Sequence, residues 1–324
     1  MSRAIALFSG GLDSILAVRL LLEQDVEILA VSFETPFFDS EKGRVGADML
    51  SVPFRAVDIT EEHLAMMRAP KHGFGRNMNP CIDCHALMLR AAGRIMEAEG
   101  YDFLFTGEVL GERPKSQNRN ALRTVAKASG YRDVVLRPLS AKLLEATQPE
   151  RDGLVDRERL LDINGRSRKR QMALAEQWGI TDYPTPAGGC LLTDPNYSKK
   201  LRELWDHEPS AGADDLKFLA VGRHFRLTDA VKLVVGRDQR ENERLLGLTN
   251  SGDTKLFTPS VPGPVGVLRG NADDATRHLA AEIVARYSDA PATGEVAVVL
   301  TVDDADTQLP VVPADPEAVA ALII

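Results

Sequence analysis

The fold of the first part of the chain is decided by one stretch, Ser9-Gly10-Gly11-Leu12-Asp13-Ser14. An apolar run at residues 4–8 comes directly before it, and a helical pattern at residues 15–22 follows. The order strand, turn, helix puts two adjacent glycines where the backbone can turn sharply and approach a ligand closely. Free N–H groups of the helix N-terminus, with the hydroxyls of Ser9 and Ser14, then predict a cradle for an anion such as pyrophosphate.

Asp13 adds a second requirement to this anion site. A carboxylate beside phosphates needs a divalent cation between them, which predicts Mg²⁺ near Asp13. The stretch is not a Walker loop, because that loop has a longer glycine spacing followed by Lys. The alternative interpretation is an ordinary glycine turn between a strand and a helix.

Composition limits the class of protein. The chain has 324 residues, of which 44% are hydrophobic and 27% charged, so we expect a soluble globular protein of about two domains. No apolar run approaches the roughly 20 residues of a membrane span, and no signal-peptide pattern is present, so no membrane association is expected. Three cysteines, an odd number, favour a reducing cytoplasmic location and metal or thiol chemistry.

Apolar runs alternate with helical patterns over residues 1–205. This alternation predicts an α/β fold, a doubly wound parallel sheet with its ligands at the carboxyl ends of the strands. The predicted strands cover residues 4–8, 27–33, 52–59, 102–106 and 134–139, and the predicted helices cover residues 15–22, 84–99 and 158–178.

A second, smaller α+β domain is predicted for residues 212–290, after a composition change at residues 210–215. Its predicted strands cover residues 218–221, 224–227 and 231–235, and its predicted helices cover residues 241–248 and 275–287. Residues 291–324 predict one more strand at 295–302 and then, because of the acidic and proline-bearing composition, a mobile or partner-bound tail.

The cysteines lie in two segments, Pro80-Cys81-Ile82-Asp83-Cys84-His85 and Gly188-Gly189-Cys190. Three thiolates can hold a [4Fe–4S] cluster and leave one iron open for an external sulfur, which is the interpretation we favour. The second interpretation is a nucleophile with a persulfide or disulfide partner. Zinc ranks third, because it needs a fourth ligand, and buried inert cysteines rank last.

With the cysteines in place, the chain resembles the tRNA thiolation branch of the PP-loop ATP pyrophosphatase superfamily over about residues 1–205. The turn matches the PP-loop motif. Further stretches resemble 4-thiouridine synthetases and 2-thiouridine-synthase-like proteins: Thr106-Gly107-Glu108-Val109-Leu110-Gly111-Glu112, Ser116-Gln117, Val135-Leu136-Arg137-Pro138-Leu139, and Ala187-Gly188-Gly189-Cys190-Leu191-Leu192-Thr193-Asp194-Pro195.

This resemblance implies an adenine nucleotide alpha-hydrolase-like fold and an ATP-dependent tRNA sulfurtransferase. The enzyme would cleave ATP to AMP and pyrophosphate, adenylate a uridine carbonyl and insert sulfur. The catalytic residues would be Asp13, Cys81, Cys84 and Cys190, and the three cysteines would be the ligands of the cluster. ATP with Mg²⁺ would be bound by Ser9, Gly10, Gly11, Asp13, Ser14 and Gly107.

The chain departs from these families in two ways. It lacks the THUMP-bearing region with which 4-thiouridine synthetases hold tRNA, and it has a second cysteine where the classical 2-thiouridine synthase has one. Residues 212–290 are similar to the NFACT-type RNA-binding domain, which implies tRNA as a partner. Arg223, Arg226 and Arg237 are the predicted phosphate contacts of that domain.

Other functions remain open at this point. The sulfur would come from a donor protein or from inorganic sulfide, and the sequence does not indicate an oligomeric state. The same ATP chemistry could serve a small-molecule acceptor in sulfur or amide transfer. The chain could also be a non-catalytic RNA-binding or iron–sulfur protein that only binds ATP. Release of AMP and pyrophosphate, measured with and without RNA, separates these three functions.

Overall fold

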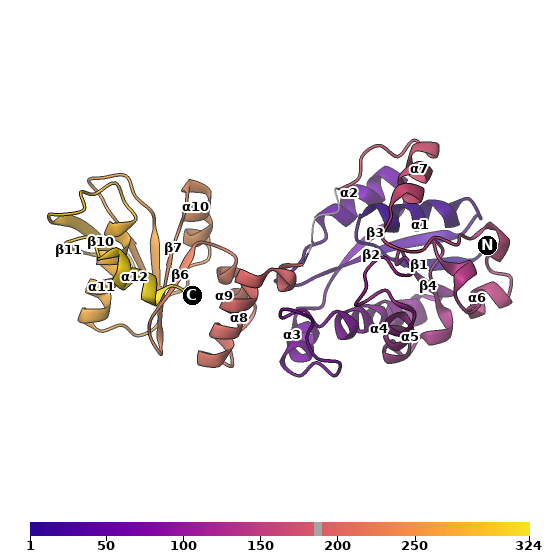
Figure 1. Ribbon diagram of the computed structural model, residues 1–324, viewed down its shortest axis with the longest axis horizontal. Helices are drawn as coiled ribbons and strands as arrows, with labels where there is room; N and C mark the ends of the chain where they lie inside the picture. The colour runs from indigo at the N-terminus through magenta and orange to yellow at the C-terminus, as the bar shows by residue number, and fades with distance from the viewer. Residues whose placement is uncertain (185–189) are drawn as a thin grey trace. The chain divides into compact units, whose positions relative to one another are not determined.

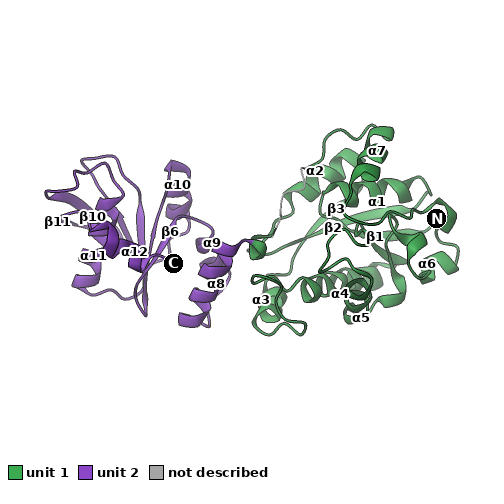
Figure 2. Ribbon diagram, viewed as in Figure 1, with its two compact units in different colours: residues 1–193 green, residues 194–324 purple. Residues whose placement is uncertain are grey.

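The computed structural model describes residues 1–184 and 190–324, which form two compact units (Figures 1 and 2). Unit 1 is residues 1–193 and unit 2 is residues 194–324. The boundary differs from the predicted one, because helix α8 (Pro195–His207) belongs to unit 2.

Unit 1 contains a parallel sheet with the strand order β3-β2-β1-β4-β5 in the described residues. The order reverses between β1 and β4, so the carboxyl ends of these neighbouring strands form the switch point where ligands bind in such sheets. The strands are β1 (Arg3–Leu7), β2 (Glu27–Glu34), β3 (Phe54–Asp58), β4 (Phe103–Thr106) and β5 (Val135–Leu136).

Helices cover both faces of this sheet, which confirms the doubly wound α/β fold (Figure 1). One face carries α1 with α2 and α7, and the other carries α4 with α3 and α5. The helices of unit 1 are α1 (Leu12–Leu22), α2 (Glu41–Leu50), α3 (Thr60–Arg68), α4 (Cys81–Glu99), α5 (Arg119–Ser129), the short α6 (Gln148–Arg151) and α7 (Lys169–Gln177).

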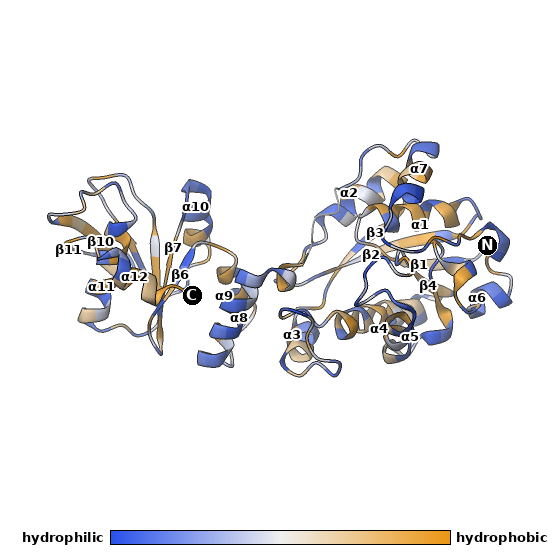
Figure 3. Cartoon of the chain, viewed as in Figure 1, coloured by the Kyte–Doolittle hydropathy of each residue, from blue (hydrophilic) through white to orange (hydrophobic). Residues whose placement is uncertain are grey.

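The strands pack a hydrophobic core on each face, because alternate side chains of a strand point to opposite sides. Ala4 and Ala6 of β1 lie in the core beneath α1, whereas Ile5 lies in the core beneath α4. The strand ribbons carry the hydrophobic colour in Figure 3, as expected for strands buried on both faces.

Unit 2 is built on an antiparallel sheet with the order β11-β10-β8-β9-β7-β6 in the described residues. Helix α11 packs on one face, and α9 and α10 contribute Phe218 and Leu245 to a smaller core. The remaining elements of unit 2 are α9 (Ala213–Leu219), β6 (Arg223–Thr228), β7 (Val231–Val235), α10 (Gln239–Gly247), β8 (Thr254–Phe257), β9 (Gly266–Arg269), α11 (Asp274–Arg286), β10 (Val296–Val302), β11 (Ala305–Val311) and α12 (Pro316–Leu322).

The end of the chain is part of this sheet, whereas the sequence predicted a tail. Strand β11 pairs with β10 along its whole length, and the N–H of Ile324 donates to the carbonyl of His224 at 3.0 Å. Strand β11 is an edge strand with mostly exposed side chains, so it lacks the apolar pattern that marks buried strands.

Two further elements differ from the prediction. The apolar run at residues 218–221 is the end of helix α9, and Phe218 and Leu219 are buried on the face of that helix. The predicted helix at residues 158–178 is reduced to α7, because Gly165 has a positive φ of 83° and forms a turn before it. Among the described residues, no helix combines the length and the apolar character that crossing a membrane requires.

Candidate functional site

The turn after β1 has the geometry of the predicted anion cradle. Gly10 has a φ of +68°, and a Cβ at this position would lie 2.0 Å from the carbonyl oxygen of Lys42. Both facts require glycine. The Ser14 hydroxyl donates to the carbonyl of Gly11 at 2.8 Å and lies 3.4 Å from the Ser9 hydroxyl. Helix α1 therefore starts with its N–H groups and two hydroxyls gathered at the switch point.

Asp13, in the first turn of α1, lies beside a second carboxylate that the sequence did not indicate. Its neighbour is Glu112, and Asp13 Oδ1 and Glu112 Oε2 are both buried without a hydrogen-bond partner among the described residues. Burial raises the pKa of Asp13, and the charges of Arg168 and Arg113 oppose that rise. Burial and the charge of Asp13 raise the pKa of Glu112.

A buried glutamine completes this group. Gln171 on α7 is fully buried, and neither atom of its amide has a hydrogen-bond partner among the described residues. The Gln171 side chain lies close enough to Asp13 to lower the pKa of that carboxyl. Unpartnered buried polar atoms are costly, so a cluster of them marks a place where a polar ligand is missing.

Hydrogen bonds between three segments bring these side chains together. The N–H of Gly165 donates to the carbonyl of Leu110 at 2.8 Å, and the Ser140 hydroxyl joins the N–H of Leu110 to the carbonyl of Ile163. The turn before α7 is thus fixed against the segment after β4. As a result, Arg168 and Glu112 reach Asp13 from different parts of the chain.

Carboxylate oxygens are the ligands that Mg²⁺ prefers in proteins. The two orphaned oxygens of Asp13 and Glu112 therefore fit Mg²⁺, with the guanidinium groups of Arg168 and Arg113 available for phosphate. The sequence predicted Asp13 for this role.

The turn after β4 packs directly against the start of α1. A Cβ on Gly107 would lie 2.5 Å from the backbone nitrogen of Ser14, so only glycine fits where the two turns meet. The predicted nucleotide-site residue Gly107 therefore lies against the cradle. Its role here is close packing.

The next residue, Glu108, is buried and fully bonded. Its carboxylate contacts His85 Nδ1 at 3.0 Å and accepts from Arg137 Nε at 3.0 Å and from the Thr106 hydroxyl at 3.1 Å. Burial alone would raise the pKa of Glu108, but the charge of Arg137 and the contact with His85 lower it to about 2. Glu108 is therefore a permanent anion that holds α4, β4 and the segment after β5 together.

Cys81 and Cys84 occupy the first turn of α4 in different surroundings. Cys81 is half-buried, and its sulfur accepts a hydrogen bond from Asn79 Nδ2 at 3.2 Å. Cys84 is buried, and its sulfur lies 3.4 Å from Nε2 of His63, a fully buried imidazole. Burial lowers the pKa of His63 to about 4, and burial with the charges of Cys190 and Cys81 raises the pKa of Cys84 well above its usual range.

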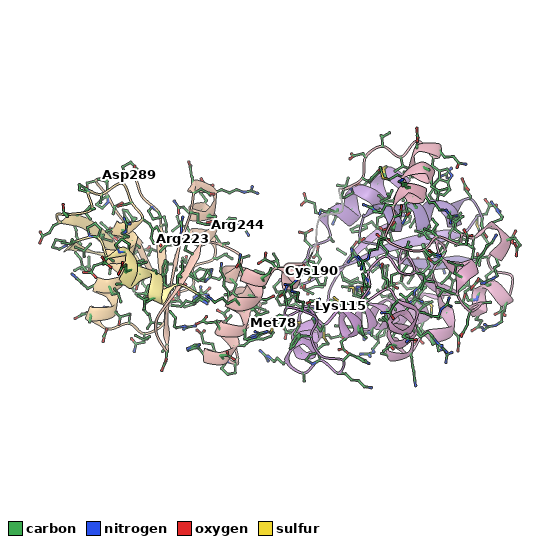
Figure 4. All side chains as sticks on the ribbon, viewed as in Figure 1. Met78, Lys115, Cys190, Arg223, Arg244 and Asp289 are labelled. Atoms are coloured by element: carbon green, nitrogen blue, oxygen red, sulfur yellow. The ribbon has the colours of Figure 1, made fainter. Side chains whose placement is uncertain are left out.

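Cys190, which is labelled in Figure 4, lies near the end of unit 1 in the sequence and within electrostatic range of Cys81 and Cys84. The N–H of Leu191 donates to the carbonyl of Phe37, whose ring lies 5.4 Å from that of His63. The carbonyl of Thr193 accepts from Asn77 Nδ2 at 2.6 Å. Burial, with a smaller contribution from the charge of Cys81, raises the pKa of Cys190 to about 11. The three thiols therefore lie within electrostatic range of one another.

The cysteines form no disulfide among the described residues. No group of three or more His, Cys, Asp and Glu side chains in the described ranges is arranged to hold a metal ion. The segment at residues 185–189, which includes the glycines of the Gly-Gly-Cys motif, lies outside the described residues. The donor types fit an iron–sulfur cluster, while the sulfur positions described here do not form a closed metal site.

Comparison with known families agrees with this geometry. Residues 1–142 match the family of thiamine biosynthesis protein (ThiI). This part of the chain is therefore similar to the ThiI family. Residues 222–323 match the NFACT protein RNA binding domain, so most of unit 2 is similar to that domain, and unit 2 is called the NFACT-type domain below.

Several curated proteins are similar to parts of the chain. The tRNA-specific 2-thiouridylase MnmA of Nitratidesulfovibrio vulgaris is 40% identical over 101 residues, which are 27% of this chain and 28% of that protein. The enzyme of the same name from Geotalea uraniireducens is 23% identical over 229 residues, which are 62% and 57% of the two chains. A probable tRNA sulfurtransferase of Oceanobacillus iheyensis is 27% identical over 146 residues, which are 42% and 34%. The chain thus spans less than two thirds of each relative.

One solved structure is a 4-thiouridine synthetase–RNA complex with bound ATP. It is 26% identical and covers 43% of this chain and 37% of its own, with a TM-score of 0.36.

The arginines predicted to hold RNA in the NFACT-type domain are engaged within the domain. Arg226 forms ion pairs with Glu203 and Glu208, and Arg237 forms one with Glu241. Arg223 lies over the ring of Tyr287, 4.8 Å from its centroid. The contact of Arg226 and Arg237 with phosphate therefore stays a prediction, and a phosphate would compete there with the carboxylates that already pair with these arginines.

Other cations of the NFACT-type domain are available. Arg240 and Arg244, one turn apart on α10, are exposed and make no ion pair or hydrogen bond with the described residues. Arg244 is labelled in Figure 4. The sequence did not single them out. Whether an arginine contacts an acidic residue depends on the folded structure, so the sequence alone cannot show which arginines are free.

Proposed function

We propose that the chain is an ATP-dependent tRNA sulfurtransferase that forms AMP and pyrophosphate. The observation that carries this proposal is the group of unpartnered polar atoms of Asp13, Glu112 and Gln171 beside the PP-loop cradle. Three thiols in the same unit supply sulfur chemistry. The similarity to tRNA thiouridylases and the NFACT-type match support RNA as the acceptor.

In the first step, the uridine carbonyl oxygen attacks the α-phosphorus of ATP. The bond from that phosphorus to the bridging oxygen breaks, and pyrophosphate leaves. Ser9, Ser14 and the N-terminus of α1 bind the departing phosphates, and Arg168 balances their charge. Asp13 and Glu112 would hold Mg²⁺, which supplies positive charge where the leaving group becomes more negative.

In the second step, the outer sulfur of a cysteine persulfide attacks the activated carbon, the carbon–oxygen bond breaks, and AMP leaves with the former carbonyl oxygen. The thiolate of a second cysteine would then attack the inner sulfur, so that the sulfur–sulfur bond breaks, the thiocarbonyl is released and a disulfide forms between the two cysteines. An external thiol reductant would reduce this disulfide for the next turnover. Buried Cys84 holds its proton at neutral pH, because burial raises the pKa of its thiol. The half-buried sulfurs of Cys81 and Cys190 are the more accessible groups for taking the outer sulfur of a donor protein's persulfide, with the donor's thiol as the leaving group. Inorganic sulfide would be used only as a ligand of an iron–sulfur cluster, because sulfide cannot form a persulfide without an oxidant.

We also propose a [4Fe–4S] cluster with Cys81, Cys84 and Cys190 as its ligands. Such a cluster leaves one iron free to bind an external sulfur. Its positive irons would offset the repulsion that raises the pKa of Cys84 and Cys190 when the three thiols are close.

The first test uses ATP labelled in its α- and γ-phosphates, with and without tRNA. We expect AMP and pyrophosphate only when tRNA is present. AMP release without RNA would favour the small-molecule acceptor, and absence of turnover would favour a binding protein. Anaerobic purification with iron analysis tests the cluster separately. Iron-free protein with full activity would contradict the cluster and leave a persulfide on the cysteines as the sulfur carrier.

A further inference from the structure

A cavity of about 310 Å³ lies at the β5 edge of the sheet in unit 1. Its lining includes the buried side chains of Leu122 and Leu136. Its rim carries four exposed arginines, two from α5, one from the turn before β5 and one from α6. They are Arg119, Arg123, Arg132 and Arg151.

The guanidinium groups of this rim have few partners. Arg119 makes no ion pair or hydrogen bond with the described residues, and it is the first residue of α5, where the helix dipole adds positive charge. Within the described ranges, the ion pairs of Arg123 and Arg132 are those with Glu145, at 3.6 and 3.7 Å, which is beyond hydrogen-bond distance. Glu145 itself is 72% exposed, so this contact is weak.

Two other charged residues of the cavity are already neutralised. Arg137 is bonded to Glu108, and Glu150 is bonded to Arg157. The cavity therefore presents an excess of positive charge over the carboxylates of Glu145 and Asp133. Guanidinium groups bind phosphate oxygens in a bidentate manner, so a phosphate is the ligand that suits this rim.

We propose that this rim, formed by Arg119, Arg123, Arg132 and Arg151, binds backbone phosphates of the RNA substrate. The proposal rests on the proposed function for the identity of the polyanion. An acidic protein with a net charge of −8 attracts RNA only through local basic surfaces. Unit 2 has 21 acidic and 14 basic residues, and several of its arginines are paired, so unit 1 must contribute to binding.

The rim suits a polyanion better than an enclosed small anion. The side chains of Arg123 and Arg132 are more than half exposed, and all four arginines that line the cavity are exposed to solvent. A strand of RNA passing over the opening can contact several of them, and each phosphate contact displaces a condensed counterion.

The experiment measures tRNA binding by the full chain at several salt concentrations. The double variant R119A/R123A should bind about ten-fold more weakly, and the slope of log K against log salt should be smaller by about 2. R94A is the matched control, because Arg94 is an exposed arginine of unit 1 outside the cavity. It should leave affinity and slope unchanged.

A second variant acts in the opposite direction. E145Q removes the carboxylate that competes for Arg123 and Arg132, so it should tighten RNA binding several-fold, which damage to the fold cannot do.

Unchanged RNA binding in R119A/R123A, or equal weakening in R94A, would overturn the proposal. The proposal would also be overturned if R119A/R123A lost binding of labelled inorganic phosphate while its RNA binding stayed unchanged. The rim would then bind a free anion. Binding is measured without ATP, so failure of the sulfurtransferase proposal appears separately, in the assay of labelled ATP.

Discussion

The turns after β1 and β4 lie against each other, and each provides a buried carboxylate, yet the two carboxylates are held in opposite ways. Glu108 contacts three donors, and its pKa falls to about 2. Asp13 has an oxygen with no partner, and burial raises its pKa. The comparison teaches that the hydrogen-bond partners of a buried carboxylate distinguish the roles of neighbouring residues. A buried carboxylate whose oxygens are all hydrogen-bonded stabilises the fold, whereas a buried carboxylate with an unpartnered oxygen is a candidate for binding a ligand.

The largest effect is expected at the satisfied carboxylate. E108Q leaves the buried guanidinium of Arg137 without a counter-charge, so the free energy of unfolding should fall by about 3–5 kcal/mol. Urea unfolding at pH 7 measures this change. E158Q is the control, because the side chain of Glu158 is 86% exposed and its replacement should change stability by less than about 0.5 kcal/mol.

The pH dependence sharpens the same test. The folded-state pKa of Glu108 lies below its unfolded value of about 4.3, so its contribution is complete above that value and is lost as the pH falls towards 2. The stability difference between wild type and E108Q should therefore shrink between about pH 4.3 and 2. A difference that stays constant over this range would contradict the assignment of Glu108 as a permanent anion.

The second effect concerns activity. D13N removes the charge expected to hold Mg²⁺, so turnover should fall by about 100- to 1,000-fold, or roughly 2.7–4 kcal/mol of transition-state stabilisation. The pKa of Asp13 is raised, so its ionised form costs stability at pH values above that pKa. The melting temperature of D13N should therefore equal or exceed that of the wild type. A large loss of melting temperature would place Asp13 with Glu108 as a structural residue.

The third effect extends the comparison to unit 2. R226A removes a largely buried partner of Glu203 and Glu208, and it should cost about 1.5–3 kcal/mol of stability without changing the salt dependence of RNA binding. R244A removes an unpartnered, exposed arginine. It should leave stability unchanged and reduce the slope of log K against log salt for RNA binding by about 1. If R226A alone changed the slope, Arg226 would contact phosphate despite its ion pairs.

The smallest effect on stability is expected at Gln171. Q171M replaces an unpartnered buried amide by an apolar side chain of similar size, so the free energy of unfolding should change by less than about 1 kcal/mol in either direction. ATP affinity, measured by calorimetry with Mg²⁺, should still fall. Unchanged ATP affinity would show that the amide does not face the nucleotide.

The sequence predicted the parallel sheet of unit 1 well, because strands buried on both faces are continuous apolar runs, as at Glu27–Glu34 and Phe103–Thr106. It placed a strand at residues 218–221, where a short apolar run cannot distinguish a strand from a helix end. It missed β11, because an edge strand with exposed side chains carries no apolar pattern.

For the candidate site, the sequence indicated the residues that occur in motifs and missed those brought in by tertiary contact. Asp13 and the cysteines stand in recognisable stretches. Glu112 and Gln171 reach the site only because the segments after β4 and before α7 are bonded to each other. One signal was available for Glu112, since it follows a strand whose carboxyl end adjoins that of β1.

Gly107 has a mechanical consequence. The first turn of α1 and the end of β4 pack directly against each other, because Gly107 has no side chain. A Cβ on Gly107 would lie 2.5 Å from the backbone nitrogen of Ser14. The next residue, Glu108, contacts His85, which follows Cys84 on α4. One continuous series of contacts, from Ser14 through Gly107 and Glu108 to His85, therefore joins the turn after β1 to the helix that carries Cys81 and Cys84.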